Sequence, residues 1–314
     1  MIRFVLGRLA SLLPVLVVLS AVTFGLMRLI PGDPVEIMFG GEADAAAVAA
    51  TRARLGLDKP LPLQYVLWVS RLGHGDLGRS IRTNQPVAEV IAQRLPVTFE
   101  LAALAIVLIL VLGLPLGVAA AVYRDSGVDV AASSLSLLGA TIPSFFLGIL
   151  LIELLAIQLH WLPPLGYVPF LRDPLQSVRL MIMPAITLAV GLAAVTARMV
   201  RVSLLEVLAQ NFVVVARSKG LRESRVIRHH ALRNALIPVV TVVGLQFGTL
   251  LGGAVIIEQI FSLPGIGRYA LEGINLRDYP VVQGAVVAIA FSFILVNLGV
   301  DLCYGFIDPR VHYG

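Results

Sequence analysis

Six long apolar runs, separated by shorter polar stretches, set the pattern of this chain. Each run is about 20 residues long or longer, which is the length that an α-helix needs to cross the hydrocarbon core of a bilayer. The pattern therefore predicts an all-α membrane protein with six transmembrane helices. The predicted spans are Leu9–Ile30, Val97–Tyr123, Ala131–Gln158, Met181–Val200, Ile237–Phe261 and Val281–Phe306.

The sequence between the spans predicts the domain organisation. Residues 1–30 form an N-terminal tail and the first helix, whose apolar run exceeds the core of a secretory signal, roughly 7 to 15 residues, and so favours an uncleaved anchor. Residues 31–96 are polar, with good helix formers over Ala43–Leu55 and then prolines and glycines, so we expect a small lobe of short helices between helices 1 and 2. The five-helix core covers residues 97–306, with its largest polar loop at 201–236, and a tail of residues 307–314 follows.

Basic residues are concentrated on one side of the predicted spans. Lys and Arg mark the cytoplasmic loops of membrane proteins. Arg3 and Arg8 precede the first span, and a dense basic group lies between residues 198 and 233. Both termini and the 201–236 loop are therefore predicted to be cytoplasmic, and the 31–96 lobe extracytoplasmic. One pair of short loops shows the opposite bias, and the excess elsewhere outweighs it.

Composition supports the membrane assignment and limits the partners. Hydrophobic residues make up 58% of the chain and charged residues 14%, against about 25% charged in soluble domains. The net charge of +5 fits cytoplasmic loops, and basic residues do not alternate with aromatic ones as in nucleic-acid binders. We therefore expect membrane lipid, and no nucleic acid, as a partner. The single cysteine, Cys303, excludes an internal disulfide and a cysteine-based metal site.

The polar segment Asn211–Pro238 lies between two strongly apolar runs. It begins with the apolar stretch Phe212–Ala216, and Gly220 then breaks the pattern, because glycine adopts backbone angles that end a helix. Beyond the glycine, Arg222, Arg225 and later basic residues alternate with apolar ones in an amphipathic pattern. The segment predicts a short helix, a turn and a second helix that lies on the membrane surface or against a partner.

The chain lacks the motifs of several enzyme classes. It contains no GxxxxGK[ST] phosphate loop, no HExxH zinc motif and no GxSxG nucleophile motif. His229 and His230 are adjacent, which is not the spacing of two ligands on one helix face, so we assign them to a basic surface. The sequence predicts a non-catalytic chain with no metal site and no bound cofactor.

Polar residues inside the apolar runs are candidates for a translocation path. Glu153 is the strongest candidate, because a carboxylate at bilayer depth is costly unless it faces protein or water, and we expect it to point inward. The alternative for Glu153 is a hydrogen-bonded carboxyl between helices. Glu258 lies nearer a span end and is assigned a structural role. The other candidates, each of which also suits a helix–helix contact, are Gln246, Thr249 and Asn297.

Glycines at four-residue spacing predict where helices approach closely. Gly244, Gly248 and Gly252 lie on one face of the predicted fifth span, where the absence of side chains lets another helix come near. The partner helix belongs either to this chain or to a second subunit. Gly113 and Gly117 make a weaker case, because a proline lies between them and predicts a kink.

An ordered series of motifs covers almost the whole chain. The series is LIPGDP at Leu29–Pro34, LGLDKPLPLQY at Leu55–Tyr65, GDLGRS at Gly75–Ser80, RLPVTFELA at Arg94–Ala102, IPSFFLG at Ile142–Gly148, WLPPLG at Trp161–Gly166, ARSKGL at Ala216–Leu221, ALRNALIP at Ala231–Pro238, FSLPGIGR at Phe261–Arg268, RDYPVVQG at Arg277–Gly284 and the tail DPRVHYG. In these motifs the chain resembles the B-type membrane permease subunit of bacterial ABC importers for dipeptides, oligopeptides and nickel.

The resemblance implies a coupling helix that lies in a groove of the ATP-hydrolysing subunit. Ala216 and Gly220 match the small-residue and turn positions of the family signature. Val214 and Val215 depart from it, because the signature has Glu and Ala there and peptide-type members have Arg and Thr. An apolar knob buried in the groove is therefore a better expectation than a charged contact. The residues implied to couple to the ATPase are Phe212, Val215, Ala216, Arg217, Lys219, Gly220, Leu221 and Arg225.

The resemblance also implies the partners and the mechanism. A homologous C-type permease shares the translocation path, an extracytoplasmic substrate-binding protein delivers the solute, and two ATP-binding subunits use ATP and Mg. This chain binds no cofactor itself. Movement of the ATPases would drive alternating access in the bacterial cytoplasmic (inner) membrane. The family also leaves nickel, glutathione or another small solute open.

A stand-alone ion-coupled carrier is a second class of function, with Glu153 as its titrating group. Carriers of that class often contain internal repeats and interrupted helices, and the sequence shows no convincing repeat. The permease subunit is therefore the leading hypothesis.

Overall fold

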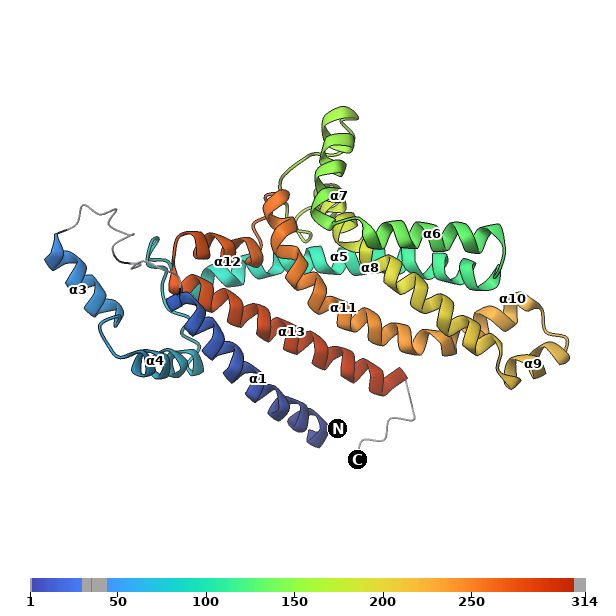
Figure 1. Ribbon diagram of the computed structural model, residues 1–314, viewed down its shortest axis with the longest axis horizontal. Helices are drawn as coiled ribbons and strands as arrows, with labels where there is room; N and C mark the ends of the chain where they lie inside the picture. The colour runs from blue at the N-terminus through green and yellow to red at the C-terminus, as the bar shows by residue number, and fades with distance from the viewer. Residues whose placement is uncertain (1, 30–34, 36–43, 308–314) are drawn as a thin grey trace. The chain divides into compact units, whose positions relative to one another are not determined.

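The computed structural model describes residues 2–29, 35 and 44–307. Within these residues the secondary structure is helical, apart from one isolated bridge between Arg79 and Pro86 (Figure 1). The prediction of an all-α protein is confirmed. The C-terminal tail and most of the LIPGDP motif lie outside the described residues.

The helices are divided between two compact units. The first unit contains residues 1–97 and 264–294, and the second contains residues 98–263 and 295–314. Two long helices, α5 (Val87–Val122) and α13 (Tyr279–Ile307), begin in the first unit and end in the second. Each unit has its own cluster of buried apolar side chains.

The first unit is built around α12 (Ile266–Asn275), whose apolar residues recur at three- and four-residue spacing. Ile266, Tyr269 and Ala270 are buried in a cluster with the first turns of α5 and α13. Gly273 lies on the same face, and a Cβ there would come within 2.7 Å of Val281 on α13, so the glycine permits the close approach. The other helices of this unit are α1 (Ile2–Leu29), α3 (Ala45–Leu55) and α4 (Leu61–Gly73).

Short helices occupy the described part of the predicted lobe. The expected helix over Ala43–Leu55 is present as α3, which Asp44 caps through a hydrogen bond from the backbone N–H of Ala46. Gly56 ends it with a φ of +69°, in the left-handed region that favours glycine. Thus local capping residues set both ends of this helix.

A buried aspartate joins the loop after α4 to the start of α13. Asp278 is 3% exposed and accepts hydrogen bonds from the Ser80 hydroxyl at 2.5 Å and from the backbone N–H of Ile81 at 3.2 Å. Its carboxylate also accepts from the N–H of Val281 in the first turn of α13. Carboxylates at helix N-termini are favoured by the free backbone donors there. The aspartate therefore fixes the loop against the helix.

The second unit is organised around α8 (Pro174–Leu208), which packs mainly against α11 and α6. A Cβ at Gly113 of α5 would lie 2.9 Å from the carbonyl oxygen of Ala193, and one at Gly117 would overlap that of Ala197. These glycines, expected to be the weaker pair, give the close approach of α5 to α8. The other helices of this unit are α6 (Gly127–Thr141), α7 (Ser144–Leu151), the π-helix η1 (Ile152–Gln158), α9 (Asn211–Ser218), α10 (Glu223–Arg225), the π-helix η2 (Val226–Ala231) and α11 (Leu232–Ile260).

The predicted glycine face of α11 is used at one end within this chain. A Cβ at Gly244 would overlap the side chain of Val300 on α13, whereas a Cβ at Gly252 would meet nothing within 4 Å. Close helix approach is thus confirmed at Gly244. Gly252 faces open space in this chain, which keeps a contact with a second subunit as a prediction.

Several helices extend well beyond the apolar runs that predicted them. α5 begins at Val87, ten residues before the predicted start at Val97, and α8 adds turns on both sides of Met181–Val200. A 35-residue helix is about 52 Å long, whereas the hydrocarbon core is about 30 Å thick, so its end turns carry polar residues. Hydropathy marks only the middle of such a helix.

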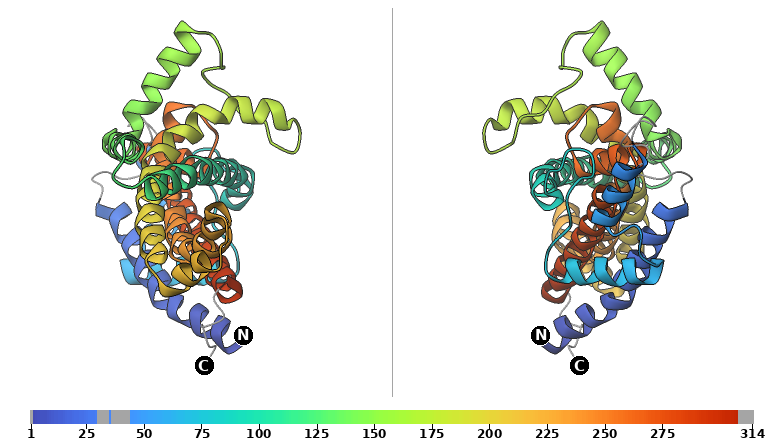
Figure 2. Two further views of the ribbon diagram at one scale, coloured as in Figure 1. Left: turned by 90° about the vertical axis from the view of Figure 1, so that its right-hand side faces the viewer. Right: turned by 90° about the vertical axis from the view of Figure 1, so that its left-hand side faces the viewer.

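The predicted third span is bent rather than straight. α6 ends at Thr141, and the pair α6 and α7–η1 bends by 98° (Figure 2). The bend follows from Pro143, because proline disfavours helical angles in the preceding residue, and Ile142 has the extended angles φ −73° and ψ 121°. A continuous helix over Ala131–Gln158 is therefore wrong.

Four helices in the described part of the chain are long and apolar enough to cross a membrane by themselves. These are α5, α8, the continuous helix Glu223–Ile260 and the segment Tyr279–Val300 of α13. The bent pair supplies a fifth if it forms one span. The predicted first span, Leu9–Ile30, begins inside the 28-residue helix α1. A multi-span membrane protein is supported, and the count of six stays a prediction.

Candidate functional site

The short helix α9 is anchored in the second unit by two of its residues. Val213 is fully buried and Ala216 is 7% exposed, and both join a cluster formed by the ends of α5 and α8 with η2 and the start of α11. Leu204 of α8 and two residues of η2, Val226 and Ala231, are fully buried partners in this cluster. Leu221, beyond the turn, packs against its edge. The small residue predicted at 216 is therefore a contact point between helices.

The side of α9 turned away from this cluster carries exposed apolar side chains next to the exposed Asn211 and Ser218. Phe212, Val214 and Val215 are 40%, 53% and 52% exposed, and we call these three side chains the apolar knob. Because Val213 and Ala216 hold the helix from below, the knob is presented on a fixed support. Apolar side chains grouped on one surface commonly mark a contact with another protein. The apolar knob expected at Val214 and Val215 is thus exposed in this chain.

The turn after α9 lies at Gly220, as the sequence predicts. Gly220 has a φ of +75° and donates its N–H to the carbonyl oxygen of Arg217 at 2.9 Å. This left-handed conformation is readily adopted by glycine and costs other residues about 1 to 2 kcal/mol. The chain then enters α10 and continues without a break through η2 into α11. The predicted helix, turn and second helix are confirmed.

An ion pair closes the turn. Arg217 donates to both carboxylate oxygens of Glu223, from Nε at 3.1 Å and from Nη2 at 2.6 Å. The hydrogen bond to Glu223 raises the pKa of the Arg217 guanidinium above its ordinary value. Both side chains are about half exposed, so the pair defines the geometry of the turn more than it stabilises the fold. Lys219 and Arg225 are exposed beside it.

Sequence reasoning predicted Arg217 but missed Glu223. The two residues are six apart, which is not a helical spacing, and they meet only because the Gly220 turn reverses the chain between them. An opposite charge pair on either side of a helix-ending glycine is the signal that could have found it. Val213 was missed for another reason, since three consecutive valines give no indication of which one is buried.

The four predicted path residues do not form one cluster in the described part of the chain. Gln246 of α11 is buried and bonds Thr196 and the carbonyl oxygen of Leu192 on α8, which is a helix–helix contact. Thr249 is exposed on α11, and Asn297 is half-buried on α13. Among the described residues, no hydrogen bond joins any two of the four.

Glu153 lies on the exposed π-helix η1. Its carboxylate accepts a hydrogen bond from the Gln158 side chain at 3.2 Å. Neighbouring side chains on α7 and η1, including Phe146 and Ile149, are more than half exposed. Within this chain Glu153 therefore faces outward, and any group that covers it must come from outside the chain.

Two further acidic residues, one assigned a structural role from the sequence and one not singled out there, are engaged inside the second unit. Glu258 is fully buried and accepts a hydrogen bond from Thr98, which fits the structural role expected of it. Asp129, which the sequence did not single out, receives two hydrogen bonds from Arg201 at 2.8 and 2.7 Å. This pair ties the start of α6 to α8, and the residues are too far apart in sequence for a spacing rule to find.

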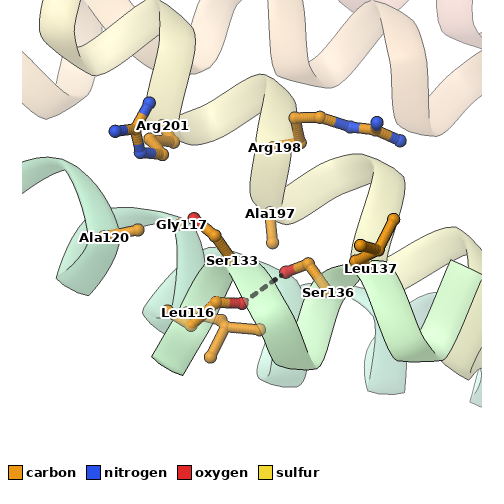
Figure 3. Close-up of a pocket in the computed structure, with 10 residues that line it drawn as sticks. Leu116, Gly117, Ala120, Ser133, Ser136, Leu137, Ala197, Arg198 and Arg201 are labelled. Carbon is orange, nitrogen blue, oxygen red and sulfur yellow. Dashed lines mark hydrogen bonds between the residues drawn. The ribbon is translucent and has the colours of Figure 1, made fainter. Parts of the chain in front are cut away.

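A small cavity of about 250 Å³ lies next to this ion pair, between α5, α6 and α8. Figure 3 shows its small lining residues, which include Gly117 and Ala120 of α5, Ser133 of α6 and Ala197 of α8. The Ser136 hydroxyl bonds back to its own helix at the carbonyl of Ala132. The cavity is too small for a peptide, and it marks loose packing rather than a path.

Comparison with protein families decides the membership of the chain. Residues 113–313 match the family described as "Binding-protein-dependent transport system inner membrane component", and residues 1–102 match its N-terminal region family. The chain belongs to this family. It is a permease subunit of an ABC importer, and the suspected resemblance is confirmed.

Relatives of this permease extend over its full length. A protein of Brucella suis biovar 1, whose name describes it as a peptide transport system permease protein, is 46% identical over 313 residues that cover 100% of both chains. The glutathione transport system permease protein GsiC of Pectobacterium atrosepticum is 40% identical with the same coverage. The binding-protein-dependent family implies ATPase and substrate-binding protein partners for such a subunit.

Solved structures show the same fold. Two crystal forms of the MetNI methionine ABC transporter in inward-facing conformations contain a chain that is 20% and 19% identical to the permease, with TM-scores of 0.59 and 0.60. In both cases the match covers 71% of this permease and 98% of the solved chain. At this identity the likeness concerns the fold alone.

Proposed function

We propose that this permease imports di- or oligopeptides and couples to its ATPase through the apolar knob. The names of the relatives support small peptides as solutes, since glutathione is itself a tripeptide and other relatives are named for peptide transport. Nickel or another small solute is the alternative within the same architecture. Binding assays with the partner substrate-binding protein decide between them, because a nickel-selective protein would contradict the peptide assignment.

The exposed knob on a buried anchor is the observation that carries the coupling role. Phe212 and Val215 are about half exposed, although Val213, which lies between them, and Ala216, which follows Val215, are buried. A groove in an ATPase would remove this apolar surface from water, and full burial of a valine or phenylalanine side chain stabilises by about 1.5 to 3 kcal/mol. The neighbouring Arg217 and Lys219 would lie at the polar rim of the contact.

A charged substitution in the knob tests this role. In the assembled transporter reconstituted in liposomes, we expect Val215→Asp to lower solute uptake per ATP hydrolysed by about tenfold or more, because an unpaired carboxylate would be buried in the groove. Ser224→Asp, which adds the same charge at an exposed position beyond the turn, is the matched control and should keep wild-type coupling. Normal uptake by Val215→Asp in a fully assembled complex would contradict the proposal.

The orientation proposed is that of the positive-inside rule, with both termini and the knob cytoplasmic and the 31–96 lobe outside. The basic residues around the knob support it, since Arg222, Arg225 and Arg228 are all exposed. In a Cys303→Ser background, a cysteine placed at the exposed Ser224, outside the proposed ATPase contact, should be labelled by a membrane-impermeant thiol reagent only in inside-out vesicles. Labelling in right-side-out vesicles would overturn both the orientation and the coupling role.

A homologous C-type permease is proposed to cover the face that carries Glu153. A carboxylate and several apolar side chains are exposed on α7 and η1, and a carboxylate facing lipid would be costly. Glu153, Thr249 and Asn297 are candidates for the path between the two permeases, whereas the bonds of Gln246 to α8 favour a packing role. The chain would be non-catalytic, with ATP and Mg used by the partner ATPases.

The stand-alone carrier is the competing function. In liposomes, the purified chain alone should neither hydrolyse ATP nor accumulate solute, and addition of the partner subunits should restore both. Uphill, ion-dependent transport by the chain alone would support the carrier instead. Glu153→Gln distinguishes further, because loss of ion dependence is expected only if its carboxylate titrates during transport.

A further inference from the structure

A basic cleft of about 820 Å³ lies in the first unit, and neither the coupling role nor the path uses it. It lies between the last turns of α1, one side of α4, the loop after α4 and the first turns of α13. We call it the basic cleft and define it by six of its lining residues, Arg28, Trp68, Arg71, Arg79, Arg82 and Tyr279.

The charge of the cleft favours an anion. Among the described residues, its lining contains four arginines and Lys59 but one acidic residue, Asp76, whose carboxylate already accepts a hydrogen bond from the backbone N–H of Gly78 at 2.8 Å. Arg28 is held in place by Gln64, to which its Nη2 donates at 2.6 Å, and its guanidinium lies 3.6 Å from the centre of the Phe24 ring. Several cations gathered in one cleft repel one another, and a bound anion relieves that repulsion.

The loop that carries two of the arginines has a fixed shape. Asp278 holds Ser80 and Ile81 through hydrogen bonds, so the residues on either side of them are anchored as well. Arg79 is further restrained, because its Nε donates to the carbonyl oxygen of Asn84 at 2.9 Å. A preformed arginine cluster loses less side-chain freedom on binding than a flexible one, which favours a specific ligand.

The position of the cleft along the helices matches the level of lipid headgroups. Phe24 and Arg28 lie in the last two turns of the apolar helix α1, and Tyr279 is the first residue of the membrane-spanning segment of α13. The cleft therefore lies where helices leave the hydrocarbon core. Tyr and Trp are enriched at this level, and two aromatic rings of α4 pack against Phe24: Tyr65 edge-on at a centroid distance of 5.3 Å and Trp68 stacked at 6.0 Å.

The outer face of α4 distinguishes a lipid from an acidic protein segment. Leu63, Val66 and Val69 are 46%, 60% and 38% exposed, on the side away from Gln64 and Arg71. Such an amphipathic helix is typical of one that lies in the membrane interface with its apolar side against acyl chains. An acidic loop of a partner protein would match the arginines but would leave this apolar face uncovered.

We propose that the basic cleft binds the phosphate of an anionic phospholipid, whose acyl chains lie along the exposed face of α4. Arginine suits this ligand, since its guanidinium bonds two phosphate oxygens at once, and each basic residue near an anionic membrane surface adds about a fivefold preference. The site is independent of the coupling role and of the solute. It would fix the lobe that contains α4 to the membrane surface.

The experiment uses the assembled transporter in nanodiscs of phosphatidylcholine that contain about one-fifth anionic lipid, so that the membrane surface is negative and attracts basic residues. A phosphatidylglycerol probe with a photoreactive headgroup is compared with a phosphatidylcholine probe carrying the same group, and crosslinked peptides are mapped by mass spectrometry. We expect the anionic probe to label the peptides around Trp68 and Arg82 several-fold more than the neutral probe.

Matched variants make the result decisive. Arg71→Gln/Arg82→Gln should lower labelling by the anionic probe about tenfold or more, whereas Arg124→Gln/Arg172→Gln, which removes the same charge from exposed sites in the second unit, should not. Arg71→Lys/Arg82→Lys should retain part of the labelling, and ATPase activity reports whether each complex has assembled. Three outcomes would each overturn the proposal. The two probes could label the cleft equally, or millimolar inorganic phosphate could displace the anionic probe. The third is that the substrate-binding protein, and not lipid, protects the cleft from labelling.

Discussion

Replacement of Gly220 by valine isolates the backbone geometry of the coupling turn from its packing. With a φ of +75°, this residue is in the left-handed region, and a Cβ built on it would meet nothing within 4 Å. Any loss in a substituted protein therefore comes from backbone strain and not from crowding. The strain is about 1 to 2 kcal/mol for an ordinary residue and larger for a β-branched one.

Relief of the strain would change the shape of the turn. If residue 220 returned to a negative φ, the chain would continue in the direction of α9, and Arg217 could no longer reach Glu223 across the turn. A cost of 1 to 2 kcal/mol changes the ratio of intact to altered turns by about 5- to 30-fold. The apolar knob would then be presented at a different angle in most molecules.

The assay is the ATP hydrolysed per solute imported by the reconstituted transporter, together with the affinity of the ATPase for the permease. We expect coupling to fall in the order glycine, asparagine, alanine, valine, because asparagine tolerates the left-handed region better than alanine does. Gly220→Asn is the matched control, since it adds a larger side chain than Gly220→Ala but less strain. The reasoning fails if Gly220→Val is coupled normally, or if loss follows side-chain size instead of this order.

Three other outcomes are expected. Val213→Ala should lower the free energy of unfolding of the second unit by about 2 kcal/mol, because it leaves a cavity in the cluster beneath α9. Val214→Ala, at an exposed site, should change the free energy of unfolding by less than about 0.5 kcal/mol. Equal thermal stabilities of the two variants would show that Val213 does not anchor α9. Asp129→Asn should lower the temperature of thermal unfolding, because Arg201 loses its charged partner; unchanged thermal unfolding would show that the pair is not needed. Burial, and to a smaller extent the hydrogen bond to Glu100, raise the pKa of Tyr167 from 10.0 to about 12. The contribution of the Tyr167 hydroxyl to stability is therefore complete below pH 10 and is lost as the pH rises through about 12. Tyr167→Phe should remove one late tyrosinate absorbance step, and a wild-type spectrum without such a step would contradict the assignment.

The features that the sequence predicted well are local ones. Gly220 ends α9 because its own backbone freedom decides the turn, and Asp44 and Gly56 set the ends of α3 in the same way. Apolar runs located the long helices because burial in lipid needs a minimum length of apolar sequence. Their ends were misplaced, as at Val87, because the turns outside the bilayer are helical without being apolar.

The features that the sequence could not predict depend on contacts between distant segments. Three consecutive valines on α9 are chemically identical. Only the packing of Val213 against Leu204 and Val226 buries Val213 and leaves the other two valines exposed in the apolar knob. Gly113 and Gly117 were expected to be the weaker pair because of the proline between them, but the tertiary fold places α8 against that face of α5. Asp129 and Arg201 likewise meet only after α6 and α8 have packed.

Glu153 shows that the surroundings of a polar residue in a permease depend on the whole assembly and not on a single chain. The cost of a carboxylate at bilayer depth predicted an inward-facing residue, yet within this chain it is exposed among apolar side chains. Both observations hold if the interior in question lies between two permeases and not within one. The same argument applies to Gly252, which faces open space here although its spacing suits a close helix contact. A double-cysteine scan that joins these two positions to the partner permease is therefore a sharper test of the translocation path than any substitution within this chain.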